Sequence, residues 1–513
     1  MGKRHLPALL ITPILYCGLL STSMLTPAIA QEDASVVSYE PDYFLKFEPV
    51  SLLDMLQRIP GVPEILNKNR RSRSQRGFGS GGDQILIDGR RLAGKSNNIN
   101  DALSRISANQ VAKIDLIRGA ASGLDVQSQG LVINITLAEG ASKSTTFWKV
   151  YGEYTEGYKF IPQFLVSHSG QKGGLEYTIT AERKNDFGYR PREEVFYDGN
   201  DVITGAQDVD SSFNFKGIKL TSNLTYTFSD GDELRLNGLY DPNQFNTFET
   251  RIETGNDPDH VIWNGDRDNA RWEVGGDYTF NLGSFGKFKS LFVVNQNTED
   301  TEVKRERDYI DPRFLYRNEF TDGKLSEKIF RSSTTVNVIG NQSLEVGGEV
   351  AINTFEKIFE SFGRDTAAEE LLLGTSSNVD IKENRYEIFA IHNLNLASKL
   401  VLQSSITTEF SKIVADNLFA DGSVDRRDTS FKYFKPRVNL RYDHTDSDQV
   451  RITIEKKVSQ LRFNTFVTSY DAQNDEVRFG NTNLRPTQTW EFIFAYEHRL
   501  PNDTGSIEGQ VFY

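Results

Sequence analysis

Hydrophobic and polar residues alternate with a period of two along most of the chain after residue 144. In one segment Val346 and Val350 alternate with Glu345 and Glu349. A period of two places successive side chains on opposite faces of a β-strand. Segments of about ten to sixteen residues repeat this pattern. The pattern predicts antiparallel strands over residues 144–513, and we count about 15 of them.

The predicted connections alternate between short turns, such as Ser229–Asp232, and longer polar stretches that we expect to be loops. Short turns on one side and long loops on the other are typical of a transmembrane β-barrel, whereas a sandwich has no reason to keep this asymmetry. Charged residues on one face of each strand fit a wet interior. The expected loops lie near residues 189–210, 251–267, 304–327, 361–384, 414–428 and 465–487.

The N-terminal part has a different pattern, which predicts a small mixed α+β unit over residues 49–143. A helix is expected over Ser51–Ile59, where Ser51 and Asp54 form a capping box and Pro60-Gly61 ends the helix. Three short apolar strands and a further short helix follow. These elements are expected near Ile85–Ile87, Val111–Ile117, Leu131–Ile135 and, for the helix, Asn100–Ile106.

The first 30 residues read as a secretory signal peptide. Lys3 and Arg4 precede an apolar stretch over Leu6–Leu20, and the small-residue site Ala28-Ile29-Ala30 predicts cleavage after Ala30. The one cysteine, Cys17, lies inside this segment, so the mature chain is expected to form no disulfide bond.

Composition and motifs exclude several classes of function. The formal net charge of -13 argues against nucleic acid as a partner. No apolar run after the signal peptide is long enough for a membrane-spanning helix. No catalytic set and no metal-binding spacing of histidines is found, so we expect neither an enzyme nor a resident cofactor or metal.

Four segments, taken in order, resemble the plug of TonB-dependent outer-membrane receptors. They are the Arg76-Gly77 loop, the strands Gln84–Arg90 and Val111–Gly119, and the closing Gly130–Ile135. The resemblance covers residues 31–143 closely. It implies a plug within the lumen of a barrel of 22 strands in the full-length protein.

The strand count of 15 therefore suggests a C-terminus truncated at Tyr513. An alternative stays open, because Ile507, Gly509, Val511 and Tyr513 alternate toward an aromatic end, as the last strands of outer-membrane barrels do.

The resemblance implies a monomeric barrel in the outer-membrane lipid of a Gram-negative bacterium. Such a receptor binds a scarce extracellular solute, for example a siderophore, cobalamin or a saccharide, and imports it with energy from the periplasmic TonB coupling protein. The alternative is a non-transporting surface receptor or adhesin that uses the plugged barrel for display.

Two sets of site residues follow from the resemblance. The N-terminal segment 31–48 contains one candidate coupling strip, which adds a strand to the coupling protein; a plain linker is the other interpretation. In the family, plug arginines pair with barrel glutamates and lock the plug; ordinary water-bonded lumen charges are the alternative. The coupling strip is Ser35, Val36, Val37 and Ser38, and the lock residues are Arg76, Arg118 and Glu491.

Overall fold

The structure is a computed structural model of the 513-residue chain, which separates into Met1–Ala34 and Ser35–Tyr513. Everything below concerns the second unit. The predicted signal peptide lies outside the described residues, and the predicted domain boundaries stay predictions. The structure describes residues 36–60, 62–63, 65–66, 85–89, 103–104, 106–118, 131–138, 144–155, 160–256, 258–309, 314–338, 342–366, 368–419, 421–445, 447–466, 469–471, 476–478, 484–500 and 506–513.

The N-terminal part contains a four-stranded mixed sheet in the order β1-β3-β4-β2. The antiparallel pairs are β1 with β3 and β3 with β4, whereas β2 and β4 run parallel. Apolar side chains that include Leu52, Ile114 and Ile133 form its fully buried core. The predicted strands are therefore confirmed. The three predicted strands are β2 (Ile85–Ile87), β3 (Val111–Arg118) and β4 (Leu131–Leu137), whereas β1 (Val36–Tyr39) was not predicted as a strand.

Short helices cover this sheet. The predicted helix after Ser51 is confirmed as α2 (Leu52–Leu56), which ends three residues before the predicted end at Ile59. Its capping box forms as expected: the Asp54 amide donates to Ser51 Oγ at 3.3 Å, and the Ser51 amide donates to Asp54 Oδ2 at 2.9 Å. The helix predicted over 100–106 lies mostly outside the described residues. Further helices of this part are α1 (Pro41–Phe44), η1 (Leu45–Phe47) and η2 (Ala108–Gln110).

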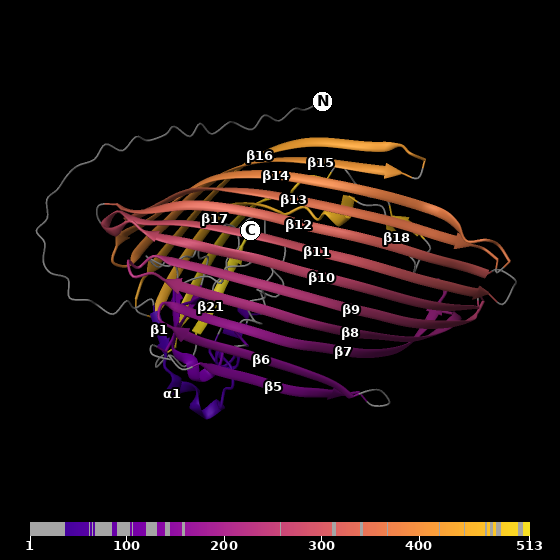
Figure 1. Cartoon of the computed structure of the whole chain (residues 1–513), viewed down its shortest axis with the longest axis horizontal. Helices are drawn as coiled ribbons and strands as arrows, with labels where there is room; N and C mark the ends of the chain where they lie inside the picture. The colour runs from indigo at the N-terminus through magenta and orange to yellow at the C-terminus, as the bar shows by residue number, and fades with distance from the viewer. Residues whose placement is uncertain are drawn as a thin grey trace, which may run out of the picture. The chain divides into compact units, whose positions relative to one another are not determined.

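Most of the rest of the unit is one antiparallel sheet, and its 15 strands among the described residues confirm the count made from the sequence. Neighbours in the sheet are neighbours along the chain, except that β17 pairs directly with β20. Figure 1 shows the long strands β7 to β16 side by side and the sheet curling round behind them. The strands are β5 (Thr145–Tyr154), β6 (Phe160–Lys172), β7 (Leu175–Tyr197), β8 (Ile203–Thr227), β9 (Glu233–Gly255), β10 (Asp259–Asn281), β11 (Gly286–Tyr309), β12 (Phe314–Val338), β13 (Gln342–Arg364), β14 (Leu372–Ala397), β15 (Leu400–Phe419), β16 (Val424–Asp443), β17 (Asp448–Val458), β20 (Gln488–Arg499) and β21 (Ser506–Phe512).

In a soluble protein the buried face of a sheet is apolar and the exposed face is polar. In this sheet the buried face is polar and the exposed face is apolar. On β14 the charged residues Arg385 and Glu387 are buried, whereas Tyr386 and Ile388 are 52% and 64% exposed. We call the face with the buried residues the inner face and the other the outer face. An apolar, exposed outer face beside a polar inner face is the arrangement of a membrane β-barrel. The predicted fold class, a membrane all-β sheet preceded by a small mixed plug, is confirmed.

The exposed apolar residues form a band on the outer face, near the short turns. On β13 to β15 this apolar band includes Val346, Val350, Tyr386, Ile388 and Phe410. Among the described residues, no helix is long and apolar enough to cross a membrane.

Beyond the band the strands continue where the sequence predicted loops. The predicted loop near 361–384, for example, is mostly part of β13 and β14, and only residues 365–371 connect these strands. The loop prediction was wrong there because the phase of the alternation changes within the strand. On β14, for example, Val379 and Ile381 are buried on the inner face, whereas Tyr386 and Ile388 are exposed on the outer face. When a period-two pattern shifts by one residue, the apolar positions move to the other face, and the sequence then suggests that the strand has ended.

The connection between β17 and β20 is the one predicted loop that remains long among the described residues. It contains η4 (Phe463–Phe466) and the hairpin of β18 (Ser469–Asp471) and β19 (Glu476–Arg478). Its apolar side chains pack on the inner face of β13, β14 and β15 beyond the apolar band. This cluster consists of Leu461, Phe463 and Phe466 with Phe355, Val379, Ile381, Ile413 and Ala415.

Candidate functional site: a charged network on the inner face

Three glutamates lie directly opposite one another on neighbouring strands of the inner face. Glu349 on β13 pairs in register with Glu387 on β14, which pairs with Glu409 on β15. All three are at most 6% exposed. Like charges that face each other across strands are destabilising, so this row requires compensating cations.

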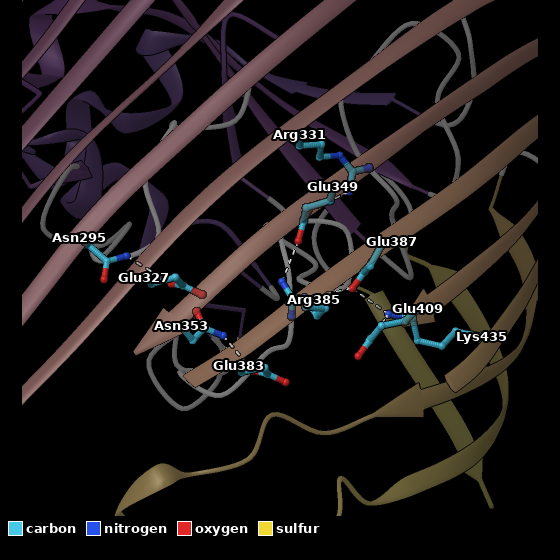
Figure 2. Close-up of polar contacts among 10 residues, drawn as sticks. All are labelled: Asn295, Glu327, Arg331, Glu349, Asn353, Glu383, Arg385, Glu387, Glu409 and Lys435. Carbon is cyan, nitrogen blue, oxygen red and sulfur yellow. Dashed lines mark hydrogen bonds and ion pairs between the residues drawn. The ribbon is translucent and has the colours of Figure 1, made fainter. Parts of the chain in front are cut away.

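Cations from the neighbouring positions supply that compensation, as Figure 2 shows. The Arg385 guanidinium lies 2.8 Å from Glu349 Oε1 through Nη2 and 3.6 Å from Glu387 Oε1 through Nε. Lys435 Nζ on β16 lies 3.1 Å from Glu387 Oε1 and 2.8 Å from Glu409 Oε2. Each of these two cations therefore bridges a pair of glutamates.

The network continues on β12 through Arg331. Its Nη1 lies 3.5 Å from Glu349 Oε2 and its Nη2 lies 4.0 Å from Glu345 Oε1. The same guanidinium stacks on the ring of Phe389, with Cζ 3.8 Å from the ring centroid. A continuous series of paired charged side chains thus runs across five strands, from β12 to β16.

Glu383 adds a further carboxylate, which accepts a hydrogen bond of 2.9 Å from Asn353. With it, the described network has five carboxylates and three cations, a formal excess of two negative charges. We name these residues the inner-wall network: Arg331, Glu345, Glu349, Glu383, Arg385, Glu387, Glu409 and Lys435.

A buried network of this kind is weak evidence for stability, since desolvation offsets much of the attraction between the charges. Removing one partner is different, because it strands the other charge in a medium of low dielectric constant. The network therefore holds its side chains in one arrangement.

The sequence analysis did not single out this network. The signal was available in Glu383, Arg385 and Glu387, three charges at alternate positions of one strand. Their partners could not be identified without the register that places Glu349 opposite Glu387 and Glu409.

The predicted lock residues are only partly within the described structure. Arg76 lies outside it, and the backbone of Arg118 ends β3 while its side chain lies outside the described residues. Glu491 is on β20, opposite Glu455. Its Oε2 accepts a hydrogen bond of 2.6 Å from Lys457 Nζ, which also lies 2.7 Å from Glu455 Oε1. The lock stays a prediction.

The predicted coupling strip lies largely in β1, since Val36, Val37 and Ser38 belong to this strand and Ser35 is outside the described residues. Val37 is buried, and Ser38 Oγ donates a hydrogen bond of 2.6 Å to Asp115 on β3. Its role in coupling stays a prediction.

The N-terminal sheet and the long sheet together define a class of protein, a plug domain followed by a membrane β-sheet. Residues 29–129 match the family model of the TonB-dependent Receptor Plug Domain, so this part of the chain is a plug domain of that family. The resemblance noted in the sequence is confirmed.

Solved structures of such receptors are similar to this chain at low identity. The siderophore receptor PiuA from Acinetobacter baumannii is 11% identical, with a TM-score of 0.49 over 93% of this chain and 72% of that one. The ferric citrate transporter FecA is 13% identical, with a TM-score of 0.46 over 94% and 69%. The ferric-catecholate import receptor Fiu from E. coli K12 is 10% identical, with a TM-score of 0.45 over 93% and 73%.

Proposed function

We propose that this protein is a TonB-dependent outer-membrane receptor that binds a scarce extracellular solute and imports it into the periplasm. One combined observation carries the proposal: a plug domain of this family precedes a sheet whose outer face is apolar and exposed and whose inner face is charged. The solute is a small molecule of the siderophore, cobalamin or saccharide kind. We also propose that the protein is exported with cleavage of the signal peptide after Ala30. In the outer-membrane lipid it is a monomer.

The geometry of β1 supports a role in coupling. It is an edge strand of the plug sheet, and its pairing with β3 extends over four residues, Val36 to Tyr39. Removing it would leave β3 paired with β4, so a pull on the N-terminal segment can detach β1 without breaking the rest of this sheet. A detached strand is then available to add to the sheet of the coupling protein.

The register connects this strand to the proposed lock. Val36 pairs with Ile117, the residue before Arg118. Force on the coupling strip is therefore transmitted first to the end of β3 that carries a lock arginine. We propose that Arg76 and Arg118 meet carboxylates of the barrel, with Glu491 as one partner.

Deletion of Ser35–Ser38 tests the proposed function. Cells with the deletion should bind the solute at the surface as the wild type does but should lose its uptake. A strain without the coupling protein should show the same separation of binding from uptake. Solutes would be screened with the wild type, by binding and by growth.

The other outcomes are informative. Uptake that survives both the deletion and the loss of the coupling protein would contradict energy-coupled import. Surface binding with no uptake in the wild type would favour the alternative, a non-transporting receptor or adhesin.

A further inference from the structure

Four neighbouring strands carry a lysine at the same place on the outer face. On each of β14 to β17, the first charged outer-face residue beyond the apolar band, on the side away from the short turns, is a lysine. We call this row the lysine border: Lys382, Lys412, Lys432 and Lys456. The chain as a whole is acidic, with a net charge of -13, so four lysines in a row run against its composition.

The lysine border follows the edge of the apolar band. The exposed apolar residues that come just before these lysines, on the side of the short turns, are Tyr386, Phe410, Phe434 and Ile454. On β15 and β16, Lys412 follows Phe410 by two residues and Lys432 precedes Phe434 by two, because the strands are antiparallel.

The register shows that the row from Lys382 to Lys432 runs at an angle to the strands. Lys382 faces Val414 rather than Lys412, and Lys412 faces Ser430 rather than Lys432. From Lys382 to Lys412 and from Lys412 to Lys432, each lysine is thus displaced along the strand in the same direction. The edge residues Tyr386 and Phe410 of the apolar band lie directly opposite each other. Strands of membrane barrels are tilted by about 35–45°, so an inclined row of this kind lies level with the membrane.

The ammonium groups of the border are available to solvent or to lipid headgroups. Lys382, Lys412 and Lys432 are exposed, and Lys456 is half-buried. Lys412 Nζ lies 2.9 Å from Asp428, but both side chains are about half exposed, and pairs of this kind are weak. Lys432 Nζ lies 5.3 Å from the ring centroid of Phe410, at the edge of the apolar band.

We propose that the lysine border binds the phosphate groups of outer-leaflet lipids. The inference rests on the proposed function in one respect, that the apolar band marks the membrane. A lysine placed just beyond such a band buries its alkyl chain against lipid and extends its ammonium group to headgroup level. The border lies on the side of the band away from the short turns, which is the outer leaflet for a receptor whose plug faces the periplasm. A lipid with a phosphorylated headgroup, such as lipid A, fits both the charge and the apolar band.

The test is lipid binding to the full chain in detergent, measured by native mass spectrometry with lipid A and with phosphatidylcholine. The wild type should bind lipid A in preference. The variant Lys412→Glu/Lys432→Glu should lose affinity for lipid A by at least about 25-fold, since each lysine near an anionic surface contributes about fivefold. Lys412→Gln/Lys432→Gln should lose less.

The matched control is Lys304→Glu/Lys324→Glu. These two lysines also lie on the outer face, beyond the band, and their Nζ atoms are 2.9 Å from Glu302 and 3.9 Å from Glu356. The control should bind lipid A as the wild type does, and heat-modifiable migration on gels checks that every variant is folded.

Equal losses in the border and control variants would overturn the proposal in favour of general charge attraction. Competition by inorganic phosphate as effective as that by lipid A would overturn it in favour of a simple anion site. Solute uptake is measured separately: its absence in the wild type would count against the proposed function and leave the lipid result standing.

Discussion

Arg385 donates a hydrogen bond to Glu349 from one strand to the next, with Nη2 2.8 Å from Oε1. The two side chains are 1% and 0% exposed, so the pair is removed from water. They are not opposite each other in register, since Arg385 pairs with Ala351. The guanidinium instead reaches diagonally between Glu349 and Glu387, which makes it the central cation of the inner-wall network.

We therefore expect Arg385→Gln to be strongly destabilising. The substitution leaves Glu349 and Glu387 facing each other while buried, and loss of one partner of a buried pair costs about 3–5 kcal/mol. The measurement is the free energy of unfolding in detergent, from denaturant titration. Adding Glu349→Gln should recover part of the loss, because it removes one of the stranded charges.

The control is Arg426→Gln on the outer face, whose Nη1 lies 3.2 Å from Asp416. Both side chains are well exposed, so the loss should be less than about 1 kcal/mol. Equal losses for the two arginines would show that burial of the network has no energetic consequence.

Two double-mutant cycles distinguish the possible partners of Glu491. The first combines Glu491→Gln with Lys457→Met, whose ammonium group lies 2.6 Å from Glu491 in the structure. This pair should show coupling of about 0.2–1 kcal/mol, as partly exposed pairs do. The second combines Glu491→Gln with Arg118→Gln and tests the lock.

If the lock exists, the second cycle should also be non-additive, and amide exchange over Ile114 to Ile117 should become faster in both single variants. Additive effects with Arg118 alongside coupling with Lys457 would show that Glu491 is a wall charge without contact to the plug.

The sequence predicted the fold where a single strand or turn carries the signal. Ser51 and Asp54 are three residues apart, and the capping box they form is local. Alternation such as that around Val346 and Glu349 likewise needs no partner strand. The inner-wall network is different, because Glu349, Arg385 and Lys435 are far apart in sequence and meet only through register.

The length of the strands also could not be predicted from the sequence, for a physical reason. Within the apolar band the environment outside the sheet is lipid, and apolar residues point outward. Beyond it, apolar residues such as Val379 and Ile381 point inward and pack on Phe463. A single strand therefore has apolar residues on its outer face within the band and on its inner face beyond it. A prediction that assumes one phase of alternation ends the strand where the phase changes.

Ser38→Ala should separate the stability of β1 from its role in coupling. The change removes the 2.6 Å hydrogen bond from Ser38 Oγ to Asp115, worth about 1.5–3 kcal/mol for a charged acceptor. Amide exchange at Val36 to Tyr39 should become faster. If β1 must detach during transport, uptake should be at least as fast as in the wild type. Slower uptake with unchanged solute binding would mean that the paired strand itself is the active form.

The turn between β7 and β8 should respond to acid. The amides of Val202 and Asn200 donate to the Asp198 carboxylate at 2.9 and 2.8 Å, and these bonds hold its pKa below the ordinary value of about 3.9. Because the pKa is lowered on folding, the stabilising contribution is present above pH about 4 and is lost as the pH falls through the folded value. Carbon NMR titration of the Asp198 carboxyl should give a midpoint below 3.9, and Asp198→Asn should abolish this titration. A midpoint at or above the ordinary value would contradict the expectation.

The strands that continue beyond the apolar band also affect the entropy of capture. On β14, residues 372–384 extend past the band as hydrogen-bonded strand, a length of roughly 40 Å at about 3.3 Å per residue. Ordering a loop costs about 1–2 kcal/mol per residue in backbone entropy. Here that cost is met during folding, before any solute arrives. A solute that enters between these walls would lose its own freedom of motion and leave the ordering of the protein almost unchanged.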